Sequence, residues 1–534
     1  MRIVRRTPLS AIYDIAVVGS GFAGSLFAMI ARRQGRSVIL LERGRHPRMV
    51  IGESSTPLSN LLLEELANRY DLPAVRPLAK WGSWQEHYPH MPCGLKRGFS
   101  FFHHDLRHPR PSQITPENHF LVAASPHDAI ADTHWYRAEF DQFLVEQARE
   151  LGAEYIDELH LQRFTEAADH IELTGKRHGA EQTIRARLIV DATGPRGCLH
   201  RLLNLPETSF PAYPATQALY SHFSGVKPLA THSTDWQSSP PYPVEAAAVH
   251  HVFDGGWVWL LHFNNGITSA GVAATEAMAS SLGLPDGAAA WDRLLRLIPS
   301  LADQFANAEA VLPFTHLPLL SFRSGKIVAE RWTLLPSAAG FVDPMLSTGF
   351  PLTLLGVSRL AAALERHRGQ PSLQAELSGY ASITEEELEA TAGLIGALYK
   401  NMHNFAAFRG ITMLYFAAAS FSETARRLEK PHLAQSFLLC NDPRFGPSSR
   451  RLLERAQAGI AERDNAAFLE DVRRAIVPFD VAGLCTESDL PWYPVDANDL
   501  RRSAWKVGAT EEEIERMLDR ADFHPSSSTL PSTR

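Results

Sequence analysis

Three glycines near the start of the chain, Gly19, Gly21 and Gly24, follow an apolar run and have the spacing of a dinucleotide-binding turn. In such a turn the first glycine permits the bend, the second lets the backbone approach a pyrophosphate, and the third lets the next helix pack on its strand. The phosphates bind where free N–H groups and the helix dipole favour an anion. The segment therefore predicts a strand, a turn and a helix that cradle a dinucleotide, with Phe22 and Ala23 in the same turn.

Acidic residues end two further apolar runs. Glu42 follows the predicted strand 37–41 and stands eighteen residues after Gly24, where a carboxylate can bind ribose hydroxyls. Glycine spacing alone also suits a strand-to-helix turn without a ligand, but an acid at this distance disfavours that alternative. The predicted strand 186–190 ends at Asp191 and a glycine turn, and such an end belongs beside the cofactor.

A second glycine-led loop, 51–57, contains Glu53 and Ser54 and runs into a leucine-rich helix predicted over 59–69. Two interpretations are equally supported and compatible. The loop is a flavin neighbour, or it is a helix N-cap in which Ser or Thr precedes a proline in the first turn.

One lysine, Lys96, stands between two glycines ahead of an alternating aromatic strand. Without further context a solvated lysine at the end of a hairpin is the simpler interpretation, because lysines are mostly exposed. The surrounding segment 72–126 is rich in Trp, His, Pro and Arg and reads as an insertion that covers a site. Its histidines lack the pattern of a ligand set, so we expect no metal.

Residues 200–325 read as strands broken by Pro and Gly. Trp257 and Trp259 lie two positions apart in a predicted hairpin, so they project from the same face of a sheet. They form either a wall of the core, which bare spacing favours, or an aromatic wall beside a substrate.

A loop that opens a helix is predicted from Phe341 onward. Backbone N–H groups near Ser347, Thr348 and Gly349 face outward at this helix start, which makes a small anion site. A helix cap by Ser347 with no anion is an equal alternative.

Composition favours a small-molecule partner. The 534 residues suggest about three or four domain-sized units. Lys and Arg number 52 against 59 for Asp and Glu, and the net charge of −7 provides no broad positive field for nucleic acid or acidic lipid. Four widely spaced cysteines without a C-x-x-C pair indicate neither a disulfide framework nor a zinc ribbon, and a reducing cytoplasm fits best.

The remaining segments carry no catalytic motif. The first apolar run is interrupted by Asp14 and reads as a strand rather than a signal peptide. Because the most apolar stretch, 411–419, is shorter than the ~18–20 residues of a spanning helix, we expect no integral membrane segment. Residues 366–520 read as amphipathic helices and 521–534 as a disordered tail.

Taken together, these motifs resemble the flavin-dependent halogenases, a branch of the flavoprotein monooxygenases with the p-hydroxybenzoate hydroxylase-type FAD fold. The resemblance covers about residues 11–360. It rests on the glycine cradle, on Trp257-x-Trp259 and, most specifically, on Phe341-x-x-Pro344-x-x-Ser347-x-Gly349. Two weaker similarities are Arg137-x-x-Phe140-Asp141, in a helix predicted to open at His134, and Asp191-Ala192-Thr193-Gly194.

The resemblance implies an α/β (α+β) fold. A Rossmann-like FAD-binding domain of the glutathione reductase or p-hydroxybenzoate hydroxylase type is joined to a β-sheet substrate domain and a C-terminal helical region. The expected boundaries are 11–70, 125–200 and 325–365 for the FAD-binding domain, 71–124 and 201–324 for the substrate sheet and its insertion, and 366–520 for the helices.

The resemblance also implies a chemistry. Reduced FAD and O2 convert chloride or bromide into hypohalous acid, which a lysine relays to an electron-rich aromatic, phenolic or pyrrolic compound, either free or carrier-tethered. Lys96 matches that lysine best by position, and Lys80 is the runner-up. An ammonium can hydrogen-bond the acid or form a haloamine, which fixes the halogen toward the substrate. Thr348 and Gly349 are the expected halide site.

The other implied site residues fall into two groups. The substrate tunnel is expected to include Trp257, Trp259, Pro344 and Ser347. The expected FAD contacts are Gly19, Gly21, Phe22, Ala23, Gly24, Glu42, Arg43, Glu53, Ser54, Arg137, Asp191, Gly194, Asp343 and Gly349.

Two departures from the family pattern keep alternatives open. Leu261-His262 stands where the tryptophan motif normally continues to Ile-Pro, and Pro336-Ser337 stands where related monooxygenases have Gly-Asp, a loss that Asp343 can offset. The alternatives are a same-fold FAD-dependent monooxygenase or reductase without halogenation, and a non-catalytic flavin-binding partner in a biosynthetic assembly. Since no second Gly-rich βαβ unit is found, we expect a separate flavin reductase to supply reduced FAD.

Overall fold

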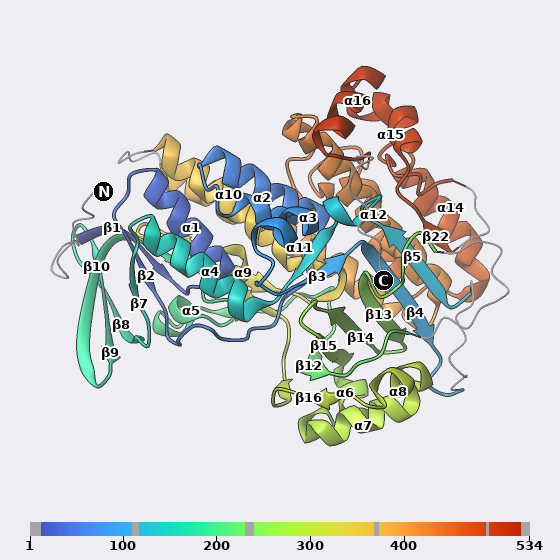
Figure 1. The fold of residues 1–534 in the computed structure, drawn as a ribbon, viewed down its shortest axis with the longest axis horizontal. Helices are drawn as coiled ribbons and strands as arrows, with labels where there is room; N and C mark the ends of the chain where they lie inside the picture. Colours follow the sequence, from blue (N-terminus) through green and yellow to red (C-terminus); the bar gives the residue numbers. More distant parts are fainter. Residues whose placement is uncertain (1–11, 109–116, 230–239, 368–372, 487–490, 525–534) are drawn as a thin grey trace.

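A computed structural model describes residues 12–108, 117–229, 240–367, 373–486 and 491–524 (Figure 1). Among these residues the chain forms two large sheets and two small ones, surrounded by helices. The first sheet and its helices lie on the left of Figure 1, and the second sheet and the C-terminal helices lie on the right.

The first large sheet is built around β1, at the centre of five parallel strands in the order β20-β10-β1-β2-β7. The strands are β1 (Ile12–Val18), β2 (Val38–Leu41), β7 (Glu154–Ile156), β10 (Ala180–Asp191) and β20 (Trp332–Leu334), with β19 (Val328–Ala329) beside β20 and the hairpin of β8 (His160–Glu166) and β9 (Ile171–Arg177) beside β10. Strands β1, β2 and β10 thus bring the glycine turn, Glu42 and Asp191 to one edge, because the carboxyl ends of parallel strands meet there.

The helices of this half contact one another as well as the sheet. They are α1 (Phe22–Arg33), α2 (Pro57–Arg69), α4 (Arg137–Glu150) and α10 (Gly349–Arg366), with the short α3 (Trp81–His87), α5 (Cys198–Leu202) and α9 (Pro336–Ala339) nearby. Helix α1 lies against α4 and α10, and α10 also lies against α2. A run of buried residues from Phe22 to Ala31 lets α1 sit inside these layers.

The second large sheet has the order β16-β12-β15-β14-β13-β4-β5-β22, with β17 beside β12. Its strands are β4 (Gly98–His104), β5 (His119–Ala123), β12 (Thr216–Ser224), β13 (Ala248–Phe253), β14 (Gly256–His262), β15 (Ile267–Thr275), β16 (Glu309–Ala310), β17 (Thr315–Leu317) and β22 (Trp492–Tyr493). The hairpin predicted around the two tryptophans is confirmed as β13 and β14, which pair in antiparallel register with Val252 opposite Trp257.

Residues 200–325 are not purely β, and the prediction was wrong over part of this segment. Helices α6 (Glu276–Leu282), α7 (Ala288–Leu297) and α8 (Pro299–Phe305) pack beneath the second sheet. Trp291, Leu294, Leu301 and Phe305 are buried there. These residues recur three and four positions apart, which is the spacing of one face of a helix and not the alternation of a strand. The segment therefore buries its apolar side chains as helices.

Two short sheets connect the halves. One pairs β3 (Cys93–Lys96) with β6 (Asp132–Trp135), and the other consists of β11 (Glu207–Thr208), β18 (Phe322–Ser324) and β21 (Gly340–Phe341). The helix predicted to open at His134 begins at Arg137 instead, because His134 and Trp135 pair with β3. The pairing of β3 with β6 brings residues of the insertion next to the loop 51–57, which is expected to border the flavin and is named the flavin-side loop.

The C-terminal region is helical, as predicted. Its helices are α11 (Leu373–Lys400), α12 (Phe405–Arg427), α13 (Gly446–Gln457), α14 (Asn465–Ile476), α15 (Ala497–Ser503) and α16 (Glu511–Arg520). Two helices, Met345–Arg366 and Phe405–Arg427, are long and apolar enough to cross a membrane, but 78% of the apolar window of each is buried inside the protein. Most of the predicted tail, 525–534, lies outside the described residues.

Candidate functional site

The glycine turn has the geometry that its spacing predicts. Gly19 adopts φ +98°, a conformation that favours glycine. A Cβ on Gly24 would lie 2.0 Å from the Gly19 carbonyl oxygen, so only glycine allows this close packing. A Cβ on Gly21 would lie no closer than 3.4 Å to its nearest neighbour, the Arg137 guanidinium. Helix α1 starts at this point without a side-chain cap, so the N–H groups of its first turn stay available to an anion.

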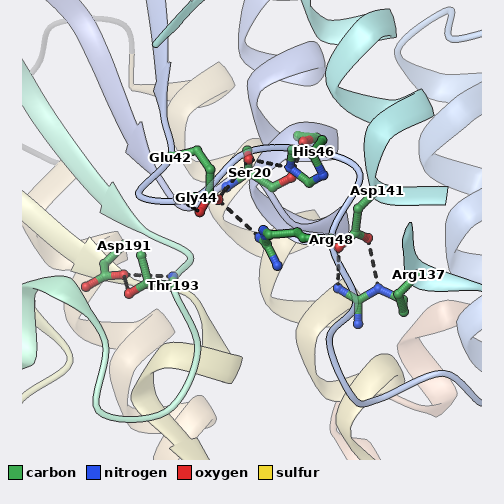
Figure 2. Close-up of polar contacts among 10 residues, drawn as sticks. Ser20, Glu42, Gly44, His46, Arg48, Arg137, Asp141, Asp191 and Thr193 are labelled. Atoms are coloured by element: carbon green, nitrogen blue, oxygen red, sulfur yellow. Dashed lines mark hydrogen bonds and ion pairs between the residues drawn. The ribbon is translucent and has the colours of Figure 1, made fainter. Parts of the chain in front are cut away.

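The Glu42 carboxylate is buried beside this turn and is already hydrogen-bonded (Figure 2). It accepts hydrogen bonds from the Ser20 N–H (3.0 Å) and hydroxyl (2.9 Å) and from the Gly44 N–H (2.8 Å), and it pairs with Arg48 at 3.1 Å. Burial alone would raise the pKa of Glu42, but the Arg48 charge and these hydrogen bonds lower it to about 2. Glu42 is therefore ionised and fixed, while Arg43 is exposed on the following turn.

Arg137 links helix α4 to the loop before α2. Its guanidinium donates to both oxygens of Asp141 at 2.8 Å and to the Gly52 carbonyl at 2.7 Å. It also lies over the Phe22 ring, 5.2 Å from the centroid. Since Phe22 opens α1, this arrangement holds a positive charge close to the cradle.

Asp191 stabilises its own turn. Its carboxylate accepts hydrogen bonds from the Thr193 N–H at 2.8 Å and the Leu199 N–H at 2.6 Å. Burial raises the pKa of Asp191, and these hydrogen bonds oppose the effect. Gly194 adopts φ +80° in the same loop. This loop borders Gly19, because a Cβ on Gly19 would lie 2.8 Å from the Ala192 carbonyl.

The loop at 51–56 is a helix cap and also holds a buried acid. Thr56 caps α2 by accepting from the Ser59 N–H, so the capping interpretation is correct. Glu53 pairs with His222 of β12 at 2.7 Å, and both side chains are buried. The second Glu53 oxygen, Oε2, is buried without a hydrogen-bond partner among the described residues.

Lys96 is fully buried, so the interpretation as a solvated lysine was wrong. Its ammonium donates hydrogen bonds to the Ser54 hydroxyl at 2.9 Å, to the Ser55 carbonyl, and to the Ser347 hydroxyl at 3.5 Å. It also lies 3.9 Å from the centroid of the Phe99 ring. The ammonium thus connects the flavin-side loop with the loop that opens α10.

Asp132 stands directly opposite Lys96 in the β3–β6 pair. Both side chains are buried, and the two groups act on each other. Burial lowers the pKa of Lys96, and burial raises the pKa of Asp132; the opposite charge of the partner limits each shift. Lys96 is the only lysine among the described residues whose side chain is fully buried.

Asp343 of the 341–349 motif belongs to a buried network. Its Oδ2 accepts from the hydroxyls of Tyr213 at 2.7 Å and Tyr399 at 2.9 Å, and its Oδ1 accepts from the Met345 N–H at 2.9 Å. Burial raises the pKa of Asp343 to about 6, although the three hydrogen bonds oppose the shift. Because Tyr399 belongs to α11, the network ties the motif to the C-terminal helices.

Thr348 and Gly349 open α10, a helix of 18 residues without a side-chain cap at its start. The predicted cap by Ser347 is therefore absent among the described contacts, and the anion site at this helix start stays a prediction. Both residues line a small cavity together with Asp343 and Ser337. Thr348 and Gly349, the halide residues that the resemblance implies, therefore directly follow Ser347, whose hydroxyl accepts a hydrogen bond from Lys96.

The two hairpin tryptophans are buried and adjacent, with ring centroids 5.8 Å apart. The Trp257 N–H donates to the Tyr399 hydroxyl at 3.1 Å, and the Trp259 N–H donates to the Ser269 hydroxyl at 3.3 Å. Neither tryptophan lines the mainly apolar cavity that Phe99 and Tyr415 border. Their role as a substrate wall stays a prediction.

That cavity has a volume of about 150 Å³ and lies between the insertion and the C-terminal helices. Its lining is mainly apolar and includes Phe99, Asp132, Tyr415 and Lys80. The runner-up Lys80 pairs with Asp522 at 3.6 Å, away from the contacts that Lys96 makes. The cavity therefore borders Lys96 through Phe99 and Asp132.

Comparison with known proteins identifies the family. The sequence profile of the family described as tryptophan halogenase matches residues 115–408, more than half of the chain. The chain belongs to this halogenase family. A profile of the NAD(P)-binding Rossmann-like domain matches residues 17–62, which contain the glycine cradle.

Individual halogenases are more distant. Monodechloroaminopyrrolnitrin halogenase PrnC of Pseudomonas fluorescens is 27% identical over 363 residues, or 66% of this chain and 61% of PrnC. Tetracycline 7-halogenase of Kitasatospora aureofaciens is 27% identical over 387 residues, or 70% of this chain and 67% of the relative. The solved structure of halogenase PltM with phloroglucinol and FAD covers 90% of this chain and 99% of its own at 22% identity, with a TM-score of 0.76. The fold is thus that of a flavin-dependent halogenase.

The residues of this halogenase-family chain suit FAD. The uncapped start of α1 and the space beside Gly21 fit a pyrophosphate, and Arg137 provides a nearby positive charge. The buried Glu53 oxygen without a partner among the described residues leaves a place for a hydrogen-bond donor of a bound group. FAD carries such donors.

Sequence reasoning missed several groups in this halogenase fold. Asp132, Asn60 and His222 come from three separate elements, and their proximity depends on strand register that no local pattern specifies. One signal was present for Asp132, since a carboxylate at the start of an otherwise buried strand needs a partner. Tyr213 and Tyr399 carried no such signal.

Proposed function

We propose that this chain is an FADH2- and O2-dependent halogenase, an FAD-dependent oxidoreductase that acts on an electron-rich aromatic, phenolic or pyrrolic compound. One observation carries the proposal: a fully buried ammonium, that of Lys96, touches both the flavin-side loop and the loop that opens α10. A buried ammonium costs free energy unless its surroundings compensate the charge, so the placement of Lys96 between these two loops favours a role in chemistry.

When bound in its reduced form, FAD would activate O2, and O2 would supply the oxidising equivalents that convert halide into hypohalous acid. The backbone N–H groups of Thr348 and Gly349 hold the halide at the uncapped start of α10. Lys96 receives the hypohalous acid as a hydrogen-bond donor. Its longest hydrogen bond, 3.5 Å to Ser347, is the weakest of its three contacts and the one that the acid displaces.

The acceptor occupies the cavity of about 150 Å³ that Phe99 and Asp132 border. Its mainly apolar lining suits an aromatic compound and excludes bulk water from the ammonium. We further propose that a separate reductase supplies reduced FAD, since no second glycine-rich turn was found in the sequence. NADPH oxidation by the purified protein alone tests that point, and fast oxidation contradicts it.

A second candidate function is hydroxylation by the same fold. It is favoured by Leu261-His262, which replaces the Ile-Pro continuation of the tryptophan motif, and by Pro336-Ser337 in place of Gly-Asp. In this case the same cavity holds the acceptor, but oxygen rather than halogen is transferred.

The test is mass spectrometry of a panel of phenols and pyrroles incubated with the protein, a flavin reductase, NADH, FAD and O2. Parallel reactions contain chloride, bromide or no halide. Halogenated products that require the matching halide are expected. Hydroxylated products in all three reactions identify the second candidate, and FAD binding without any product identifies a non-catalytic flavin-binding partner.

A further inference from the structure

Two cationic side chains among the described residues line the mainly apolar cavity that Phe99 and Tyr415 border: Lys80 and Arg427. Arg427, the last residue of α12, is enclosed by other elements, since the charges of Glu64 on α2 and Asp132 on β6 act on it. Its side chain nevertheless keeps 25% of its surface accessible. Because Arg427 is a lining residue of the cavity, this accessible part is open to a compound bound there.

The Arg427 guanidinium has more hydrogen-bond donors than the fold uses. Its Nε donates to the Glu423 carboxylate, one helical turn earlier, at 2.8 Å. Within the described part of the chain neither Nη atom donates a hydrogen bond, and both keep accessible surface. A guanidinium carries five N–H donors, and polar groups in apolar surroundings are normally paired. The Nη donors are therefore free for an acceptor on the bound compound.

The charges around Arg427 decide which acceptor fits. Glu423 forms an ion pair with it, and Glu64 and Asp132 add further negative charge nearby. A carboxylate on the bound compound would be repelled by these groups and would lose its hydration without a free counter-ion. A neutral carbonyl oxygen accepts from the same N–H groups and adds no charge. The site therefore fits a carbonyl group better than an acid.

Helix α12 also sets the distance between this donor and the reacting ring. Phe416, Glu423 and Arg427 lie on the face of α12 that lines the cavity. The Phe416 ring packs against Phe99, with centroids 5.5 Å apart, and Phe99 lies 3.9 Å from the Lys96 ammonium. Glu423, which holds the guanidinium, follows Phe416 by two helical turns, roughly 10 Å along the axis.

Resting on the proposed halogenation, we propose that Arg427 is a specificity-determining residue that selects aromatic acceptors with a neutral carbonyl group roughly 10 Å from the reacting ring. The class comprises aryl compounds whose side chain carries an amide, ester or ketone. The Nη groups donate to the carbonyl oxygen while the ring lies against Phe99, next to Lys96. Arg427 thus positions the acceptor and takes no part in halogen transfer.

The test measures kcat and KM for a series of (4-hydroxyphenyl)alkanamides of increasing chain length. Each amide is compared with the corresponding carboxylic acid and with the alkylphenol of equal length. The variants are Arg427→Gln and Arg427→Lys. Arg426→Gln is the matched control, because Arg426 precedes Arg427 on α12, pairs with Glu65 at 2.8 Å and is not among the described lining residues. Calorimetry measures amide and acid binding to the FAD-loaded protein separately.

We expect wild type to have a KM for the best amide about 10-fold or more below that for its acid or for 4-hydroxybenzamide, with similar kcat values. Arg427→Gln should raise this KM about 10-fold and leave that of the alkylphenol unchanged. Arg427→Lys should recover part of the loss, because an ammonium still donates but lacks the planar fork. Arg426→Gln should keep the wild-type preference.

The calorimetric comparison of amide and acid in wild type decides the point even if no Arg427 variant folds. Equal or tighter binding of the acid, or an amide preference that survives Arg427→Gln, overturns the assignment while the halogenase function stands. A wild type that binds the amide in preference to the acid but halogenates no acceptor overturns the proposed function and leaves the carbonyl site in place.

Discussion

The buried carboxylates of the dinucleotide cradle and of the surroundings of Lys96 have opposite pKa shifts. In the cradle, Glu42 accepts three hydrogen bonds and pairs with Arg48, which keeps it ionised. Next to Lys96, one oxygen of Asp132 has no hydrogen-bond partner within the part of the chain that the structure describes, and burial raises the pKa of Asp132. The first region is built to hold a ligand in place, whereas the second keeps a proton transferable near neutral pH.

The largest effect that separates the two regions is expected at the cradle glycines. A Cβ on Gly24 would lie 2.0 Å from the Gly19 carbonyl oxygen, and only a shift of the backbone could relieve this clash. Gly24→Ala should cost about 3 kcal/mol or more of unfolding free energy and abolish FAD binding. Gly21→Ala, whose Cβ meets nothing closer than 3.4 Å, should fold normally but bind FAD more weakly.

Urea denaturation and flavin absorbance of the two glycine variants measure these effects. Equal stability of Gly24→Ala and wild type would contradict the tight packing of α1 against its turn.

The cradle could be predicted from sequence because its chemistry is local. The three glycines and Glu42 fall within one strand–helix–strand unit, and each occupies a position fixed by backbone geometry. The local sequence favours an exposed Lys96, and only the family resemblance implies a reactive role. Its burial depends on contacts with Ser54 and Ser347, 42 and 251 residues away.

Asp132 has one sequence signal, a carboxylate at the start of a buried strand, but its position opposite Lys96 depends on the register of β3 against β6. A shift of one residue would turn it to the other face. The helices α6 to α8 were missed for a different reason: an alanine-rich stretch between strands was interpreted by the pattern of its neighbours instead of by its own helical period.

The second expected effect concerns the network that joins the α10 loop to the C-terminal helices. Tyr399→Phe removes a hydrogen bond to Asp343 and the acceptor of the Trp257 N–H, and should cost about 1–3 kcal/mol of unfolding free energy. Tyr213→Phe is the matched control, since it removes a hydrogen bond to the same oxygen without disturbing Trp257.

The pH dependence of stability sharpens this test. Burial raises the pKa of Asp343 to about 6 in the folded protein, above its value in the unfolded chain. Its contribution to stability is therefore complete below about pH 4 and declines as pH rises through 6. Tyr399→Phe should raise the pKa further and extend the decline to higher pH. Urea midpoints that do not depend on pH in this range would contradict the buried acid.

A smaller effect is expected in the pH profile of halogenation. Activity should fall on the alkaline side as Lys96 loses its proton, at a lower pH than for an ordinary lysine, because burial lowers the pKa of Lys96. The Asp132 carboxylate opposes that shift, so Asp132→Asn should move the alkaline limb to still lower pH. An alkaline limb that Asp132→Asn leaves in place would contradict the assignment of that limb to Lys96.

The smallest effect is expected at the runner-up lysine. Lys80 pairs with Asp522 at 3.6 Å near the surface, and its partner is largely exposed. Asp522→Asn should change the unfolding free energy by less than about 1 kcal/mol. Thermal denaturation measures this change, and a loss of several kcal/mol would show that the pair anchors α16.

In the proposed reaction Lys96, and no other lysine, passes the halogen to the acceptor. The most direct measurement compares Lys96→Ala with Lys80→Ala for halogenated product and for halide-dependent oxidation of reduced FAD. We expect Lys96→Ala to bind FAD and consume O2 as wild type does but to form no halogenated product, and Lys80→Ala to retain product formation. Halogenation by Lys96→Ala at the wild-type rate would contradict the account.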